Sequence, residues 1–181
     1  KKLLFELGIA YGGQNKFLQA MQVFKEALKF SLDDPILHYQ LGVIYQELSI
    51  YDLAIIEYKV YLQTNPDDII VNYLVGESYF VQSLYEDAIG YFKKNIDITS
   101  YQDIKSLHYL GLCYLELENY KNAAKYFKLA LQINPEHSKA RFNLINIYLT
   151  LHKDKEAKKE CEILYMLDRE LFHSISFCSN I

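Results

Sequence analysis

The stretch LGVIY at residues 41–45 has close copies at residues 7–11 (LGIAY) and 110–114 (LGLCY). Related versions stand at residues 75–79 (VGESY) and, with the glycine replaced, at residues 144–148 (LINIY). The glycines fall at positions 8, 42, 76 and 111, so the intervals between them are 34, 34 and 35 residues. A period of this length along a 181-residue chain predicts an array of similar structural units.

Two further columns of residues keep the same phase. An alanine follows the repeat tyrosine by nine residues in every unit, at Ala20, Ala54, Ala88, Ala123 and Ala157. Four residues later comes an aromatic ring in four units, at Phe24, Tyr58, Phe92 and Phe127, and Cys161 in the fifth. Apolar residues recur at helical spacing within each unit, which predicts two amphipathic helices joined by a short turn. The Gly and Ala columns are small where the two helices cross closely. One helix pair cannot bury its apolar faces alone, so we expect the pairs to stack.

These columns and their period resemble the tetratricopeptide repeat (TPR) family. The resemblance covers residues 1–168 and implies an all-α fold, a right-handed α-solenoid of antiparallel helix hairpins that forms a TPR superhelix. We expect five units, at residues 1–34, 35–68, 69–103, 104–137 and 138–168. In place of the family's tryptophan, this chain has Leu4, His38, Asn72, Leu107 and Arg141. The fifth unit also lacks the glycine and the closing proline.

The repeat phase places the helices. The expected pairs are 2–13 with 16–30, 35–48 with 50–63, 69–82 with 84–97, 102–116 with 119–132, and 137–150 with 153–167. Ser100 and Asp103 have capping-box spacing, which predicts the helix start in the fourth unit. Residues 169–181 carry an apolar stripe, and we expect a short C-terminal capping helix there. The alternatives are a truncated sixth repeat and a tail that docks onto a neighbouring copy.

Composition limits the class of partner. The chain has 19 basic and 23 acidic residues, for a net charge of −4 at pH 7. Domains that bind nucleic acid usually have a clear basic excess, so we expect no nucleic-acid partner. No run of 18 apolar residues is present, which predicts no membrane span. A cytoplasmic location is favoured, with a periplasmic or membrane-anchored parent protein as alternatives.

The sequence shows no pattern typical of catalysis. It has no phosphate-binding loop, no nucleophile elbow and no metal-ligand spacing, so we expect no enzyme, no catalytic residue, no metal and no cofactor. We expect Cys113, Cys161 and Cys178 to be reduced thiols packed as small hydrophobes, with a Cys161–Cys178 disulfide as the alternative. The lysines between residues 153 and 159 alternate with acidic residues, which predicts a solvated helix face.

In TPR proteins the first helix of each pair lines a concave groove that holds a peptide or a helix, and the resemblance implies such a groove here. The most informative groove column is aromatic in four units and histidine in one. With its neighbouring columns it gives the expected partner-binding residues: Phe5, Ile9, Tyr39, Val43, Tyr73, Leu74, Glu77, Phe80, Lys105, His108, Tyr109, Leu112, Phe142, Asn143 and Asn146. One branch of the family clamps a terminal carboxylate with cations and amides at set positions, and the matching positions of this chain do not present that set in either of two repeat registers. An alternative is that the rings pack between helices and only tighten the array.

Two functions follow as hypotheses. The first is a non-catalytic protein-protein interaction module, an adaptor, scaffold or chaperone-like protein, which holds a peptide or amphipathic helix of another protein in an apolar, aromatic groove. The alternative is a structural or self-associating segment of a larger assembly, such as an envelope or secretion complex. That segment would use its convex face or its ends, residues 1–11 and 171–181.

Overall fold

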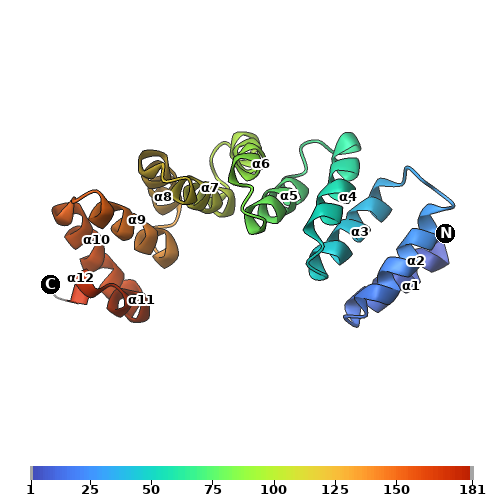
Figure 1. Ribbon diagram of the computed structural model, residues 1–181, viewed down its shortest axis with the longest axis horizontal. Helices are drawn as coiled ribbons and strands as arrows, with labels where there is room; N and C mark the ends of the chain where they lie inside the picture. The colour runs from blue at the N-terminus through green and yellow to red at the C-terminus, as the bar shows by residue number, and fades with distance from the viewer. Residues whose placement is uncertain (1, 180–181) are drawn as a thin grey trace. The chain divides into compact units, whose positions relative to one another are not determined.

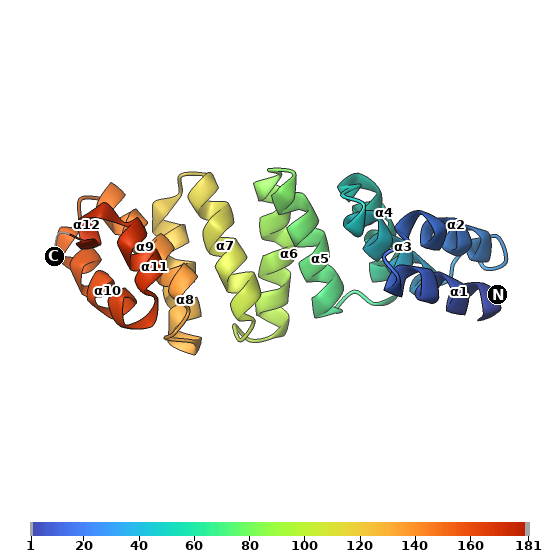
Figure 2. The same ribbon diagram turned by 90° about the horizontal axis from the view of Figure 1, so that it is seen from below.

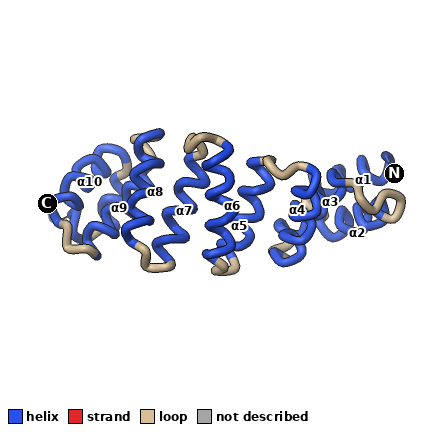
Figure 3. Tube along the Cα trace, turned by 90° about the horizontal axis from the view of Figure 1, so that it is seen from above, coloured by secondary structure: helices blue, strands red, loops and turns tan. Residues whose placement is uncertain are grey.

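The computed structural model describes residues 2–179. Lys1, Asn180 and Ile181, which belong to the end segments expected to self-associate, lie outside the described residues. The helices are α1 (Lys2–Gly13), α2 (Phe17–Leu28), α3 (Pro35–Glu47), α4 (Tyr51–Thr64), α5 (Ile69–Val81), α6 (Tyr85–Ile98), α7 (Ile104–Glu116), α8 (Tyr120–Ile133), α9 (Ser138–Thr150), α10 (Asp154–Leu167), α11 (Arg169–Ser174) and α12 (Ser176–Ser179). No strand occurs between residues 2 and 179 (Figure 3). The all-α prediction is therefore confirmed.

The chain divides into two compact units, Lys1–Asn95 and Ile96–Ile181, called unit 1 and unit 2 below. In unit 1 each helix from α1 to α4 packs against the next one along the chain (Figure 1). In unit 2 α7 packs against α8, α8 against α9, and α9 against α10 (Figure 2). Sequential packing of helix pairs is the arrangement of TPR solenoids, which confirms the predicted fold class.

The turn inside each hairpin has one residue in the left-handed region of backbone space. These residues recur at the repeat period, as Asn15, Ser49, Ser83, Glu118 and His152, with φ between 53° and 60°. The backbone N–H of the next residue donates to the carbonyl oxygen of the repeat tyrosine, at 2.8–3.0 Å in all five hairpins. This is the bond that closes a Schellman motif, so the backbone carbonyl of each repeat tyrosine takes part in the C-terminal cap of its helix.

The repeat glycines face the aromatic column of the partner helix. A Cβ atom built on Gly42 would lie 2.5 Å from Cδ1 of Tyr58, and one on Gly111 would lie 2.5 Å from Cε1 of Phe127. Both rings are fully buried. No side chain larger than hydrogen fits between helix and ring without displacing one of them. The glycine column therefore sets how closely the two helices of a hairpin approach.

Polar residues that replace the family's tryptophan tie the preceding loop to the helix. His38 Nε2 lies 2.9 Å from the carbonyl oxygen of Leu32, and Asn72 Nδ2 donates to that of Pro66 at 2.9 Å. Arg141 Nη2 donates to the carbonyl oxygen of Pro135 at 2.7 Å. Each acceptor stands six residues before its donor. These side chains therefore replace apolar packing by a hydrogen bond to a loop carbonyl that has no helical partner.

The start of α7 corrects one expectation. The capping-box prediction placed the N-cap at Ser100, but Asp103 is the N-cap, and its side chain accepts from the backbone N–H groups of Lys105 and Ser106. Ser100 and Tyr101 both have positive φ, at 50° and 65°, so they form a turn before the helix. Asp34 and Asp68 cap α3 and α5 in the same way. The true signal was therefore the aspartate that directly precedes α3, α5 and α7; α9 begins after His137, whose side chain makes no capping bond.

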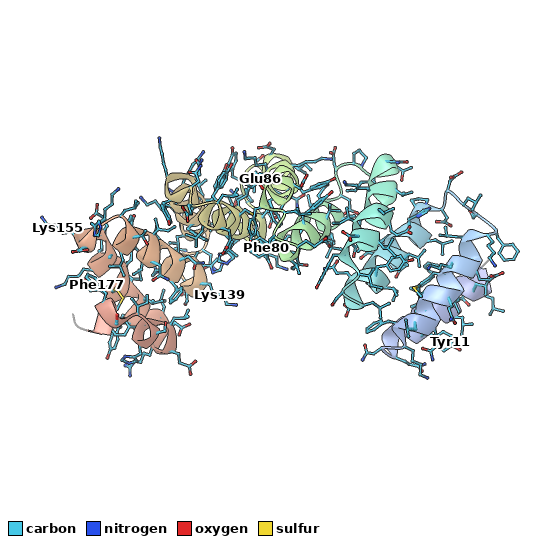
Figure 4. The ribbon with its side chains drawn as sticks, viewed as in Figure 1. Tyr11, Phe80, Glu86, Lys139, Lys155 and Phe177 are labelled. Atoms are coloured by element: carbon cyan, nitrogen blue, oxygen red, sulfur yellow. A yellow bond between two sulfur atoms is a disulfide. The ribbon has the colours of Figure 1, made fainter. Side chains whose placement is uncertain are left out.

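The segment after α10 forms the short helices α11 and α12, which pack against α10 (Figure 1). Cys161 of α10 and Cys178 of α12 form a disulfide, drawn in yellow beside the label of Phe177 in Figure 4. The expectation of three reduced thiols is therefore wrong for this pair, while Cys113 is a buried free thiol. Sequence spacing could not show this pairing, because it depends on the turn at Ile175 that folds α12 back onto α10.

Candidate functional site

All the residues expected to bind a partner lie on the first helices of the hairpins, because they were chosen by repeat phase. Unit 1 holds Phe5 and Ile9 on α1, Tyr39 and Val43 on α3, and Tyr73, Leu74, Glu77 and Phe80 on α5. Unit 2 holds Lys105, His108, Tyr109 and Leu112 on α7, and Phe142, Asn143 and Asn146 on α9. Each unit therefore presents its own part of the set, and Figure 4 shows Phe80 on α5.

A cleft of about 360 Å³ lies between α1 and α3 in unit 1. It brings together Ile9 and Val43, which the sequence placed in the groove, and adds Gln40 and Glu47 of α3. Gly12 and Gly13 also line it, and no atom lies within 4 Å of a Cβ built on Gly13. Ile9 is 42% exposed, so the cleft offers apolar surface to solvent with an amide and a carboxylate beside it.

In unit 1, each ring of the aromatic groove column packs against a ring on the second helix of the same hairpin. The ring centroid of Phe5 lies 6.0 Å from that of Phe24, and the Tyr73 centroid lies 5.9 Å from that of Phe92. Tyr39 lies 5.5 Å from Tyr61 in the same measure. These groove residues are half-buried, so each offers part of its ring to solvent while the rest packs on the second helix. The packing partners are therefore rings of the same hairpin.

Glu77 is held by neighbours that the sequence did not assign to it. Gln46 Nε2 donates to one carboxylate oxygen at 2.9 Å, and the Tyr73 hydroxyl donates to the other at 3.0 Å. The buried Tyr58 hydroxyl donates to Gln46 Oε1 at 2.9 Å, and burial raises the pKa of Tyr58. The network joins α3, α4 and α5. Glu77 is therefore a structural acceptor that orients the Tyr73 ring.

His108 of the unit 2 set packs against His137, the residue that precedes α9. Their ring centroids are 4.8 Å apart, and His108 also lies 5.5 Å from the Phe127 ring. Burial, with the charges of His137 and Lys139, lowers the pKa of His108 to about 4. Burial also lowers the pKa of His137. Both imidazoles are therefore neutral at pH 7, and His108 acts as the aromatic ring of its column.

A column of lysines on the second helices was missed in the sequence. Lys25 Nζ lies 5.4 Å from the ring centroid of Tyr45, Lys59 Nζ lies 5.1 Å from that of Tyr79, and Lys128 Nζ lies 5.4 Å from that of Tyr148. Each lysine stands twenty residues before its tyrosine, so it covers the tyrosine of the next repeat. The available signal was a lysine directly after the second-helix ring, at Lys25, Lys59, Lys93 and Lys128.

Residues 2–179 show neither a metal-ligand cluster nor a membrane-spanning helix. Within that range, no group of three or more His, Cys, Asp or Glu side chains is placed to hold a metal ion. None of the helices in the described part of the chain combines the length and the apolar character needed to cross a bilayer.

Solved structures show the same fold. MamA (residue 41 to the end) from Desulfovibrio magneticus RS-1 is 20% identical, with a TM-score of 0.85, and the match covers 93% of this chain and 95% of that one. Another MamA structure is 18% identical, with a TM-score of 0.86 and coverage of 93% and 92%. YrrB, described as a TPR protein with an unusual peptide-binding site, is 16% identical, with a TM-score of 0.81 and coverage of 94% and 89%. At these identities the likeness is one of fold.

The TPR prediction is confirmed by the repeats, the helix-pair packing and these structures together. No curated protein matches the chain significantly in sequence. The sequence profile of one family, "Regulator of microtubule dynamics protein 1-3", matches residues 6–167. That match spans nearly all five predicted repeats. The chain therefore belongs to the regulator of microtubule dynamics protein 1-3 family.

Proposed function

We propose that this protein is a non-catalytic interaction module that holds a peptide or helical segment of a partner protein against its first helices. TPR folds are protein-interaction scaffolds, and the finer assignment to this face rests on the cleft between α1 and α3. That cleft exposes Ile9 and Val43 beside Gln40 and Glu47. An apolar anchor would fill such a site, and a basic residue next to the anchor would meet the Glu47 carboxylate.

A charge placed in this cleft is the direct test. We would compare the wild type with an Ile9→Asp, Val43→Asp variant by co-sedimentation with polymerised tubulin, because the family description names microtubule dynamics. The matched control is Leu53→Asp, Ile56→Asp, which places the same charges on two exposed apolar residues of α4. We expect the cleft variant alone to lose at least tenfold in affinity. Equal binding by all three proteins would remove this cleft from the account of tubulin binding.

If wild type and control both fail to sediment with tubulin, the same three proteins serve in crosslinking and mass spectrometry with cell extract. We expect at least one partner to be crosslinked by the wild type and the control and not by the cleft variant. The crosslinks on this chain should then fall on α1, α3 or α5. Crosslinks that fall only on second helices would contradict the assignment to the first-helix face.

A second candidate, self-association through the first residues, rests on exposed apolar surface there. Leu3 is 77% exposed and Ile36 is 54% exposed. A smaller cleft of about 220 Å³ is lined by Lys2, Phe5, Asp34 and Ile36. The test is sedimentation velocity over a hundredfold range of concentration. We expect a rising sedimentation coefficient that a Leu3→Glu, Ile36→Glu variant abolishes; a constant coefficient for the wild type would exclude this candidate.

A further inference from the structure

We propose that a lysine-lined cleft in unit 2 binds a carboxylate-rich peptide segment of a partner. The cleft has a volume of about 540 Å³ and lies along α8, with α9 and the turn before α10 as its other wall. Its lining includes four lysines, Lys121, Lys125, Lys128 and Lys153, and no acidic residue of the described chain. None of these residues belongs to the first-helix set described above, so this inference is independent of the proposed function.

The spacing of the lysines suits an acidic chain. Lys121, Lys125 and Lys128 stand at positions i, i+4 and i+7 of α8, and therefore share one face of that helix. They span about 10 Å along the helix axis, from a rise of about 1.5 Å per residue. Alternate side chains of an extended peptide are about 7 Å apart. Two carboxylates on one side of such a peptide can therefore lie within reach of three lysines, and Lys153 meets them from the opposite wall.

The positive charge of the cleft is not neutralised within the protein. In the described residues none of the four lysines forms an ion pair, whereas Arg141 of the neighbouring helix pairs with Glu160. Unit 2 has eleven basic and eleven acidic residues, so this clustering is local and does not reflect an overall basic charge. Lysines that lie close together repel one another, and an anionic ligand would relieve that repulsion as well as gain ion pairs.

The two tyrosines that hold the lysines favour a peptide over a nucleic acid. Lys128 Nζ lies 5.4 Å from the Tyr148 ring centroid, and Lys125 Nζ lies 5.3 Å from that of Tyr126. Both rings are only 7% exposed. Single-stranded nucleic acids bind through open aromatic faces on which bases stack, and these faces are already covered. The rings instead restrict the motion of the lysine side chains. This restriction lowers the conformational-entropy cost of forming an ion pair with a carboxylate.

The experiment uses fluorescence anisotropy with a fluorescein-labelled octaglutamate peptide, and with an octaglutamine peptide as its neutral counterpart. The variant is Lys125→Glu, Lys128→Glu. The matched control is Lys155→Glu, Lys158→Glu, which makes the same change of net charge on exposed residues of α10, where Figure 4 labels Lys155. We expect the Kd for octaglutamate to rise at least tenfold in the variant and less than threefold in the control. Affinity should also fall as salt is raised from 50 to 300 mM.

A second variant guards against a folding effect. Lys125 and Lys128 contact tyrosine rings, whereas Lys121 and Lys153 are exposed without such a contact in the described residues. Lys121→Gln, Lys153→Gln should therefore leave helicity by circular dichroism unchanged and still weaken octaglutamate binding at least threefold. Four results would overturn the proposal. The first two are octaglutamate binding that weakens equally in the α10 control, and no octaglutamate binding by the wild type at millimolar peptide. The third is tighter binding of a 20-nucleotide oligouridine than of the peptide. The fourth is displacement of the peptide by low-millimolar inorganic phosphate at constant ionic strength.

Discussion

The imidazole Nδ1 of His38 lies 2.6 Å from a carboxylate oxygen of Glu57, joining α3 to α4 across one hairpin. Its Nε2 lies 2.9 Å from the carbonyl oxygen of Leu32. Both partners are acceptors, so only the doubly protonated imidazolium satisfies both of them. Burial lowers the pKa of His38, but these hydrogen bonds, with the charges of Glu57 and Asp33, outweigh it and raise the pKa above its ordinary value of 6.5.

The raised pKa of His38 predicts a loss of stability with rising pH. The folded protein binds the His38 proton more tightly than the unfolded chain does. The contribution of His38 to the free energy of unfolding is therefore complete below pH 6.5 and is lost as pH rises through the folded pKa. We expect the urea midpoint of the wild type to fall over this interval relative to that of His38→Leu. The control His173→Gln changes an exposed histidine, and its urea midpoint should depend on pH as that of the wild type does.

His108 predicts a dependence of the opposite sign. Its folded pKa of about 4 lies below the unfolded value, so its contribution to stability is present above pH 6.5 and is lost as pH falls toward 4. A His108→Phe variant restores the aromatic residue of the column and removes the titrating group. Urea unfolding at pH 5 and pH 7 should show a smaller drop for this variant than for the wild type. Parallel drops would mean that His108 is not buried as described.

The glycine column predicts a contrast between two Gly→Ala substitutions. Gly42→Ala places a Cβ 2.5 Å from the Tyr58 ring, and overpacking of this kind costs about 1–3 kcal/mol. Gly90 lies inside α6 and has no atom within 4 Å of a built Cβ. Gly90→Ala should therefore stabilise the protein by about 0.5–1 kcal/mol through helix propensity. Denaturant unfolding of both variants measures the two signs directly.

The Cys161–Cys178 disulfide predicts a fixed pattern of thiol labelling. Denatured without reductant, the chain should take up one iodoacetamide, at Cys113; after reduction it should take up three. Reduction should also lower stability by roughly 3 kcal/mol, the value for a closed loop of about this length. Limited proteolysis should then cut between α10 and α12 in the reduced protein first. Uptake of three labels without reductant would show that the bond is absent from the protein in solution.

The turn residue Glu118 predicts a gain in stability. Glu118 has φ of 54°, a backbone conformation that is energetically unfavourable for residues with a side chain but not for glycine. Glu118→Gly should raise the thermal midpoint, by the equivalent of up to about 1 kcal/mol. The control Glu116→Gly lies two residues earlier, at the last residue of α7, and should lower it instead, because glycine is a poor helix former. Differential scanning calorimetry on both variants distinguishes a turn effect from a general effect of removing a glutamate.

The sequence predicted the helices because each repeat contains the same periodic pattern of apolar residues. Gly42 and Tyr58 stand in columns that recur four times, so the hairpin geometry could be read without tertiary information. The first-helix set was predicted in the same way, from equivalent positions in successive repeats. Lys128 illustrates a contact that position within the repeat did not reveal. Its column was visible, but the contact with the tyrosine of the next repeat depends on how the second helix of one hairpin meets the first helix of the next.

The sequence by itself determined which residues form helices, which face of each helix is buried, and which small residues allow the helices to approach, because local periodicity encodes all three. Only the tertiary structure decided which polar side chains meet. Residues from different helices or turns meet in the pairing of His38 with Glu57, the hydrogen bond from Gln46 to Glu77, the Cys161–Cys178 disulfide and the lysine cleft on α8. Such meetings depend on angles and distances between packed helices, which no one-dimensional period specifies.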